Sequence, residues 1–197
     1  MSVQAMKQAI RQRIIADRQQ IPVELRASFG DEITRRILLM PRYQAAQVVL
    51  GYMNFGAEFV SDRWAQQVLA DGKQLLLPKV NLGTRMLDIY RVASLQDDLA
   101  PGLWGIREPM SARCSKVEAA INIDFMLLPG VAFGRDGVRL GYGGGFYDKL
   151  IARLPHHPTL VGAAYAMQMV AGIPEETTDR RVHWLVTEKE TINCSGR

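Results

Sequence analysis

Four glycines fall within five residues of the segment RLGYGGGFYDK, which spans residues 139–149. Glycine has no Cβ, so backbone N–H groups at such positions can approach an anion closely, and positive φ angles cost little. The preceding apolar run, 123–133, predicts a buried strand, and a helix is expected from about residue 144. The unpaired N–H groups at the start of a helix also attract anions. A strand, a glycine turn and a helix in this order indicate a phosphate-binding loop.

The familiar nucleotide-binding motifs do not account for this loop. The pattern GxxxxGK[ST] is absent, and GxGxxG beginning at Gly141 requires a glycine where the chain has Phe146. Arg139 can neutralise phosphate, and Asp148 offers the hard oxygen ligands that Mg²⁺ takes beside nucleotide phosphates. The alternative is a tight turn without a ligand, in which Asp148 complements the helix N-terminus. Phe146 and Tyr147 either flank a planar ligand or pack in the core.

Basic side chains gather near the start of the chain. Residues 3–20 predict an amphipathic helix, in which Lys7, Arg11 and Arg18 share one face because they are four and seven residues apart. Residues 1–42 carry eight basic and four acidic side chains, whereas the rest of the chain has equal numbers of both. This asymmetry indicates an anionic ligand near the helix. A solvated helix surface and a nucleic-acid-binding module are the alternatives.

The hydrophobic pattern alternates strands with helices. Strands are expected at 45–53, 73–80, 85–92, 123–133, 159–166 and 183–189, with 85–92 less buried or at an edge. Helices are expected at 3–20, 23–40, 61–71 and about 144–153, with a short one at 167–171. The long connection 93–123 is rich in turn formers and carries Trp104. This order predicts a single α/β domain over residues 1–197, a three-layer α/β/α sandwich with a mostly parallel sheet.

Composition restricts the setting of the protein. Cys114 and Cys194 lie far apart in the chain and have no metal-ligand spacing, and the three histidines give no metal signal. No apolar run approaches the roughly 18 residues that a membrane span needs. We therefore expect a cytoplasmic protein that has no membrane partner and acts as a monomer. Nucleic acid is disfavoured as a partner because most aromatic residues lie in apolar runs or beside the glycines, apart from the basic residues.

The segment LLPGVAFGRDGVRLGYGGGFYDKLI, residues 127–151, closely resembles the C-terminal signature of the 5-formyltetrahydrofolate cyclo-ligase family. Supporting features run through nearly the whole chain and follow the order of that family. They are the K-x-x-x-R of Lys7 and Arg11, GAE at 56–58, LPKV at 77–80, LWGIREP at 103–109 and IPEETTDRRV at 173–182. The likeness is weaker over 20–40 and in the tail, 190–197.

The resemblance implies an activity. The family uses ATP and Mg²⁺ to convert 5-formyltetrahydrofolate to 5,10-methenyltetrahydrofolate, with release of ADP and phosphate. In the family's mechanism the formyl oxygen is phosphorylated, N10 attacks the activated carbon, and phosphate leaves as the ring closes. Phosphoryl transfer needs mainly positioning and charge neutralisation, which suits a chain without an evident catalytic triad.

The resemblance also assigns residues. ATP is expected to contact Lys7, Arg11, Arg139, Leu140, Gly141, Tyr142, Gly143, Gly144, Gly145, Phe146 and Tyr147. The folate is expected to contact Met53, Glu58, Tyr142, Gly143, Gly144, Gly145 and Phe146. Mg²⁺ is expected near Asp148 and Asp179. Trp104 is added as an aromatic wall for a ring, with a loop anchor as its alternative. From the residues alone, Glu58 is equally well a surface loop charge and Met53 a core residue.

Two features depart from the pattern of the family. Tyr142 and Gly144 stand where other members carry a basic residue, so the loop neutralises less phosphate charge unless Lys149 or Arg135 compensates. Phe146 stands where many members have tyrosine, so a hydroxyl contact there is not essential in this protein. A divergent member that applies the same ATP chemistry to another substrate is the second enzymatic alternative.

Overall fold

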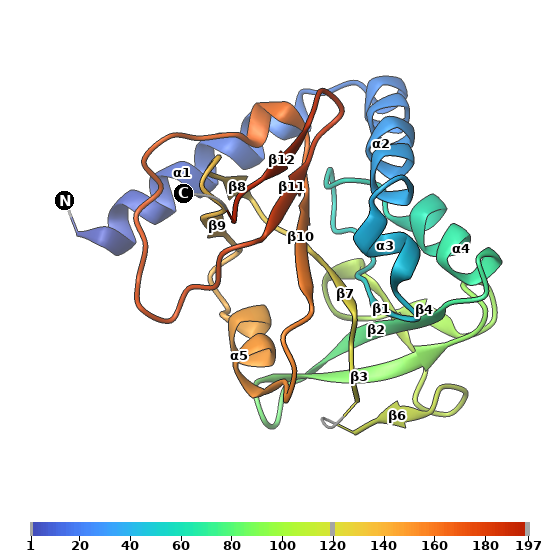
Figure 1. Cartoon of the computed structure of the whole chain (residues 1–197). Coiled ribbons are helices and arrows are strands. Elements are labelled where there is room, and N and C mark those ends of the chain that lie inside the picture. Colours follow the sequence, from blue (N-terminus) through green and yellow to red (C-terminus); the bar gives the residue numbers. More distant parts are fainter. Residues whose placement is uncertain (1, 119–120, 196–197) are drawn as a thin grey trace.

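The computed structural model describes residues 2–118 and 121–195, and it is built around one eight-stranded sheet (Figure 1). Across the sheet the strand order is β12, β11, β10, β7, β1, β2, β3, β6. In chain order the strands span Val48–Leu50 (β1), Gln74–Asn81 (β2), Met86–Val92 (β3), Lys116–Val117 (β6), Phe125–Leu128 (β7), Thr159–Ala163 (β10), Trp184–Val186 (β11) and Thr191–Asn193 (β12).

The predicted mostly parallel sheet is confirmed. All pairs from β11 through β10, β7 and β1 to β2 are parallel. The antiparallel pairs lie at the two sides of the sheet, where β12 pairs with β11, and β3 pairs with both β2 and β6. The segment expected near an edge, β3, therefore lies second from the edge, and β6 covers it over two residues.

Helices cover both faces of the sheet, as the three-layer prediction requires. Helices α2 (Val23–Leu38), α3 (Pro41–Ala45) and α4 (Asp62–Ala70) pack on one face, and α5 (Phe146–Arg153) packs on the other. Helix α1 (Val3–Gln19) instead contacts a small hairpin formed by β8 (Ala132–Phe133) and β9 (Arg139–Leu140), and also the 3-10 turn η2 (Ala166–Gln168). No helix in the described part of the chain is both long and apolar enough to cross a bilayer.

The central strands are buried on both faces because their side chains alternate between two apolar layers. In β2, Leu75 and Leu77 join the cluster beneath α2, α3 and α4, whereas Leu76 joins the cluster beneath α5. Trp64 of α4 is fully buried in the first of these clusters. This two-sided packing fixes where each strand ends, and hence where the loops after the strands are held.

Several predicted boundaries were wrong in informative ways. The run expected as one strand at 123–133 breaks after Leu128, because Pro129 and Gly130 turn the chain into β8. The connection 93–123 holds a hairpin of β4 (Leu99–Pro101) and β5 (Arg107–Pro109), joined by the 3-10 turn η1 (Leu103–Gly105). The short helix α3 and the strand β12 were not predicted. Both are short and owe their place to packing or pairing with neighbours.

Gly51 supplies a test of the packing at the end of β1. A Cβ there would lie 2.4 Å from Cζ3 of Trp64. We expect Gly51→Ala to lower the free energy of unfolding by about 1–3 kcal/mol, the usual cost of overpacking a core. Gly30→Ala in α2 is the matched control, because its nearest neighbours are 3.9 Å away and alanine favours a helix. That change should raise stability by about 0.5–1 kcal/mol in urea denaturation; equal effects of the two substitutions would contradict this account.

Candidate functional site

The candidate site lies where three neighbouring parallel strands end. After β7 the chain passes through β8 and β9 into the glycine loop, after β1 it enters the loop 51–61 that carries Glu58, and after β10 it reaches Tyr165. Ligands of open α/β sheets bind at this carboxyl edge of the strands. The sheet thereby brings together the glycine loop and Glu58, which the sequence alone left about 80 positions apart.

The glycine loop has the backbone that its sequence predicts. Gly143 has φ +103° and Gly145 has φ +64°, both in the region that disfavours residues with a Cβ. Gly145 also stands at the N-terminus of α5, which begins at Phe146, two residues later than expected. The left-handed conformation of Gly145 lets the chain enter the helix directly from the turn.

Arg11 of α1 holds this loop from the other side. Its Nε donates a hydrogen bond to the carbonyl oxygen of Gly141 at 2.8 Å. A Cβ on Gly143 would lie 3.5 Å from the guanidinium carbon of Arg11, so the side chain lies directly against the loop. The predicted pairing of the first helix with the glycine segment is thus a direct contact in the folded chain.

Lys7, one turn earlier, is almost fully buried at 3% exposure. Its Nζ donates to Oδ2 of Asp179 at 2.6 Å and to Oε2 of Glu176 at 2.9 Å. Burial lowers the pKa of Lys7, but the hydrogen bonds and charges of these two carboxylates outweigh burial and hold the pKa above its usual value. The solvated-surface alternative is therefore wrong for Lys7.

Arg139 and Asp148 form a second ion pair beside the loop. The Arg139 side chain is 3% exposed, and its Nη2 donates to Oδ1 of Asp148 at 2.7 Å. The same carboxylate oxygen accepts the backbone N–H of Arg180 at 3.0 Å. Because Arg180 follows Asp179 in the chain, the two carboxylates predicted to hold Mg²⁺ lie on adjoining segments of the fold.

The donor set permits a metal only with help from a ligand. In residues 2–118 and 121–195 no group of three or more His, Cys, Asp or Glu side chains is arranged to hold an ion. Asp148 and Asp179 each accept hydrogen bonds from two protein donors with one oxygen, and each retains a second oxygen with no hydrogen bond among the described residues. Mg²⁺ commonly takes one or two carboxylates together with phosphate oxygens and water. The pair fits that kind of site.

Glu58 is buried, so the surface-charge alternative is wrong. It is 4% exposed; its Oε2 accepts the backbone N–H of Phe55 at 2.7 Å, and its Oε1 has no hydrogen-bond partner among the described residues. Burial raises the pKa of Glu58, and the Phe55 N–H, the charge of Arg18 and the Tyr142 hydroxyl oppose that rise. A buried carboxylate with an unused oxygen is well suited to bind a ligand that carries N–H donors.

Arg18 is a site residue that sequence reasoning did not assign. It is 2% exposed, and its Nη2 donates to the hydroxyl of Tyr142 at 2.6 Å. The Tyr142 ring packs edge-on against Phe55, with ring centroids 5.9 Å apart. The sequence signal that could have identified Arg18 as a site residue is its spacing, because Arg18 follows Arg11 by seven residues on the same helix face.

Of the two side chains named as possible compensation, Arg135 pairs with Glu190, whereas Lys149 lies beside the loop, where its Cε would be 4.0 Å from a Cβ on Gly145. Arg11 and Arg18 also bring positive charge to the loop.

Other predicted residues have side chains that are buried or partly buried. Met53 and Leu140 are buried in hydrophobic clusters, and Tyr147 is packed against two of them. The ring of Phe146 lies against Gly144, where an added Cβ would be 2.6 Å away. These residues can contact a ligand mainly through their backbone or by repacking.

Trp104 lies in η1 at the tip of the β4–β5 hairpin. Its side chain is 62% exposed, and its backbone is left-handed, with φ +57°. Within the described residues it makes no hydrogen bond to the glycine loop. The structure supports neither the role of an aromatic wall nor that of a loop anchor for this side chain, so the role given to Trp104 stays a prediction.

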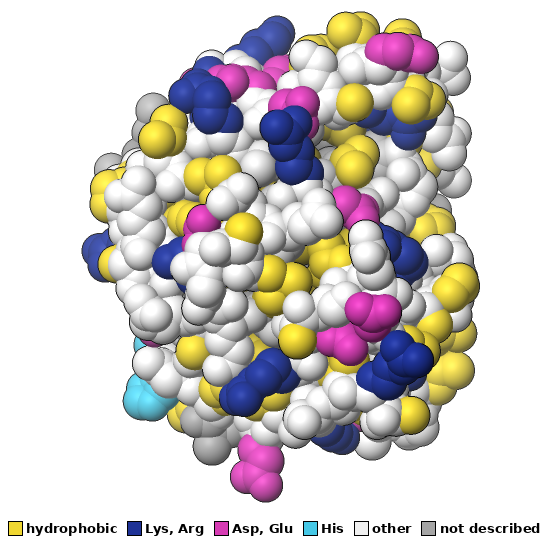
Figure 2. Space-filling model, turned by 90° about the vertical axis from the view of Figure 1, so that its right-hand side faces the viewer, with side chains coloured by type: hydrophobic (Ala, Val, Ile, Leu, Met, Phe, Trp, Pro, Cys, Tyr) yellow, Lys and Arg dark blue, Asp and Glu magenta, His cyan; other side chains and the backbone are white. Residues whose placement is uncertain are grey.

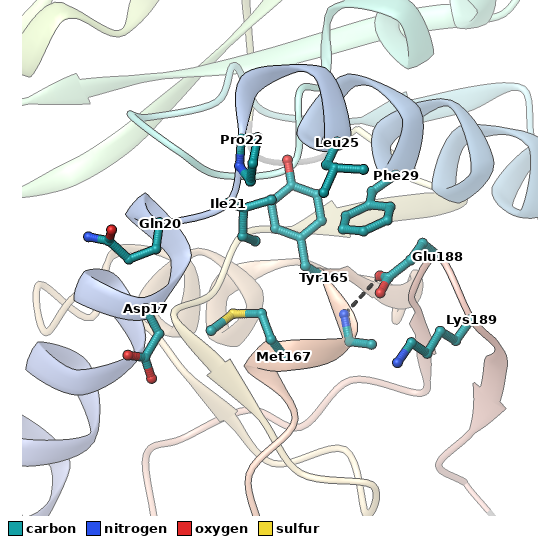
Figure 3. A pocket seen from close by; sticks show the side chains of 11 residues that line it. Asp17, Gln20, Ile21, Pro22, Leu25, Phe29, Tyr165, Met167, Glu188 and Lys189 are labelled. Carbon is teal, nitrogen blue, oxygen red and sulfur yellow. Dashed lines mark hydrogen bonds between the residues drawn. The ribbon is translucent and has the colours of Figure 1, made fainter.

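A separate pocket of about 490 Å³ lies between the end of α1, the start of α2 and η2 (Figure 3). The ring of Tyr165 forms one wall, beside Phe29 and Leu25. The hydroxyl of Tyr165 donates to the backbone oxygen of Glu58 at 3.0 Å, so this tyrosine separates the pocket from the site. No prediction placed a ligand there.

The face opposite α1 shows no concentration of basic side chains among the described residues (Figure 2). The face covered by α2, α3 and α4 shows positive and negative side chains interspersed (Figure 2). Two of the three basic residues that shared a face of α1, Lys7 and Arg18, are turned into the protein. The part of the basic charge that Lys7 and Arg18 carry is thus directed to the interior site.

Comparisons with known proteins give the same family across the chain. A family model described as the 5-formyltetrahydrofolate cyclo-ligase family matches residues 3–188. A probable 5-formyltetrahydrofolate cyclo-ligase from Caenorhabditis elegans is 29% identical, over 82% of each chain. The 5-formyltetrahydrofolate cyclo-ligase from Escherichia coli K12 is 28% identical, over 90% of this chain and 96% of its own.

Solved structures agree with the fold. The 5,10-methenyltetrahydrofolate synthetase of Aquifex aeolicus superposes with a TM-score of 0.84 at 31% identity, over 98% of this chain and 95% of its own. A synthetase of the same name from Mycoplasma pneumoniae gives a TM-score of 0.73 at 18% identity, over 92% and 98%, and bears on the fold alone. From its matched residues and its architecture, this chain belongs to the 5-formyltetrahydrofolate cyclo-ligase family.

Proposed function

We propose that this protein converts 5-formyltetrahydrofolate to 5,10-methenyltetrahydrofolate at the expense of ATP, releasing ADP and phosphate. Family membership supports the reaction class. The observation that carries the proposal is the convergence of Arg11, the glycine loop and the buried Glu58 at one edge of the sheet. One side of this junction is suited to polyphosphate and the other to a ring bearing N–H donors.

The cations and the loop would position the phosphates. Lys7 and Arg11, one turn apart on α1, can both reach a single polyphosphate chain, and the glycines allow close approach of the backbone. Arg139 is buried at the start of the loop and is ion-paired with Asp148. It therefore contributes positive electrostatic potential near the phosphates and holds the loop in place. Such groups accelerate phosphoryl transfer through positioning and charge neutralisation.

Asp148 and Asp179 would hold Mg²⁺ through the oxygens that the protein leaves unused. When bound, the ion would supply charge neutralisation at the transferred phosphoryl group. Lys7 would then exchange its contact with Asp179 for a phosphate oxygen. Both the binding of Mg²⁺ by the two carboxylates and the change of partner by Lys7 keep the number of unpaired buried charges low.

Glu58 would orient the pterin ring by accepting its N–H groups. Its fixed contact with the Phe55 N–H sets the direction of the carboxylate, and its free Oε1 provides the accepting atom. We further propose a monomer acting in the cytoplasm, a setting in which the two free, buried cysteines stay reduced.

The reaction itself is the first test. Protein mixed with ATP, Mg²⁺ and 5-formyltetrahydrofolate should form methenyltetrahydrofolate, followed by its absorbance, with one ADP released for each product. Omitting ATP or adding EDTA should abolish the signal. Folded protein that gives no product under these conditions would refute the proposed function.

The cations of α1 are the second test. We expect Lys7→Ala and Arg11→Ala each to raise the KM for ATP by about 10- to 100-fold, because each removes a charge-assisted hydrogen bond to phosphate. Arg13→Ala, on the exposed face of the same helix, is the control and should leave the KM unchanged. If both site variants lower only the melting temperature, α1 is scaffold.

The pH dependence of folate binding tests Glu58. The carboxylate must be ionised to accept N–H donors, and burial raises its pKa. Folate affinity should therefore weaken as the pH falls, with a midpoint above the ordinary glutamate value of about 4.3. Glu58→Gln should bind weakly at every pH and give a flat profile. A wild-type profile that is already flat down to the ordinary value would exclude Glu58 from the folate site.

A further inference from the structure

Two oppositely charged side chains are buried next to the glycine loop without forming an ion pair with each other. Arg18 and Glu58 are 2% and 4% exposed, and no salt bridge joins them within the described residues. Arg18 has two nitrogens, Nε and Nη1, and Glu58 has one oxygen, Oε1, that are buried and have no partner in the described chain. Buried charges are usually fully paired, so unused atoms of both signs at one place indicate a site suited to a polar ligand.

The hydroxyl of Tyr142 stands between these two groups. It accepts a hydrogen bond from Arg18 at 2.6 Å, and it lies close enough to Glu58 that each affects the other's pKa. A hydroxyl that accepts from a guanidinium retains its proton to direct toward a carboxylate. The pair therefore presents a donor on the Arg18 side and an acceptor on the Glu58 side.

A lactam edge has the complementary pattern. In the pterin ring of a folate, the 4-oxo group accepts a hydrogen bond, while N3–H beside it and the 2-amino group both donate. The oxo group would match Arg18, and the two donors would match the carboxylate of Glu58, including the oxygen that is unused in the free protein. A tyrosine hydroxyl offers one acceptor and one donor and thus satisfies only part of this site.

We propose that Arg18 and Glu58 together bind the 2-amino-4-oxo edge of the pterin, and that the Tyr142 hydroxyl occupies this place in the free protein. Tyr142 is suited to leave, because it is 41% exposed and follows a glycine in a loop that also has glycines at the next three positions. Arg18 thereby becomes a specificity-determining residue for the 4-oxo group. This inference rests on the proposed folate substrate.

The test compares two ligands that differ at the 4-position and, as a consequence, at N3, which carries a hydrogen only in the 4-oxo compound. We would measure the dissociation constants of 5-formyltetrahydrofolate and of a matched analogue with a 4-amino group in place of the 4-oxo group, in the absence of ATP. The wild type should prefer the 4-oxo ligand by about 10-fold or more, since the 4-amino group directs a donor at Arg18. In Arg18→Met the 4-oxo ligand should lose about 10- to 100-fold in affinity, and the preference should shrink to the part that N3–H contributes at Glu58.

Two further variants separate recognition from scaffolding. Arg13→Met makes the same change on the exposed face of α1 and should leave both affinities unaltered. Arg18→Lys keeps the charge and a donor, and it should retain the preference for the 4-oxo ligand even if Arg18→Met folds poorly. Equal losses for both ligands in Arg18→Met and Arg18→Lys would reduce Arg18 to a structural residue and overturn the proposal.

Tyr142→Phe tests the idea that the hydroxyl holds the place of the ligand. The melting temperature of the free protein should fall, because Arg18 loses the hydroxyl to which it donates, and the rise in melting temperature on adding folate should become larger. An unchanged melting temperature together with weaker folate binding would instead make the hydroxyl a ligand contact.

The 6-oxo, N1–H and 2-amino groups of guanine present the same order of acceptor and donors, so a guanosine nucleotide is included as a competitor. It should fail to displace the folate, because the loop 51–61 and the glycine loop are expected to bind the pterin side chain as well, and a guanosine nucleotide lacks that side chain. Displacement by guanosine would assign the site to a purine base and overturn the pterin assignment.

Turnover is recorded separately from binding. A preference for the 4-oxo ligand without methenyltetrahydrofolate as product would leave this inference standing and refute the proposed function. Turnover without the preference would refute this inference and leave the proposed function standing.

Discussion

The burial of cationic side chains from α1 against the glycine loop is the interaction on which the rest of the site depends. Lys7 and Arg18 are almost fully buried, and Arg11 donates to the loop itself. A buried cation is tolerated only with hydrogen-bond or charge partners. These partners come from distant parts of the chain, chiefly the segment 173–182 and the glycine loop, so the place of α1 depends on contacts with those segments.

Several polar groups of the site have partners within the protein itself. Asp179 pairs with Lys7, Asp148 pairs with Arg139, and the Tyr142 hydroxyl occupies one nitrogen of Arg18. Binding in the proposed reaction is thus an exchange of partners, and affinity reflects how much better the ligand satisfies these groups than their internal partners do. Such an arrangement favours ligands that can replace the internal partners with groups of the same sign and hydrogen-bonding pattern.

Much of the fold was predictable because its signals are local. The apolar runs located β1, β2, β3, β7, β10 and β11, and the helical spacing located α1, α2, α4 and α5. The errors fell where pairing or packing outweighs local preference. The strand at 123–133 stopped early at Pro129, and the short elements α3 and β12 have little pattern of their own. Short strands in the connection 93–123 were missed for the same reason, since they exist through pairing with each other and with β3.

The sequence by itself determined the glycine turn, the helix face shared by Lys7, Arg11 and Arg18, and the signature that places the chain in its family. Each of these depends on residue types at short spacing, and backbone geometry turns short spacing directly into shape. The tertiary structure alone decided that Glu58 is buried and that Arg18 faces Tyr142, 124 positions along the chain. Burial and long-range partners follow from how the strand ends and helices pack, and no local pattern encodes which distant group will fill a given space.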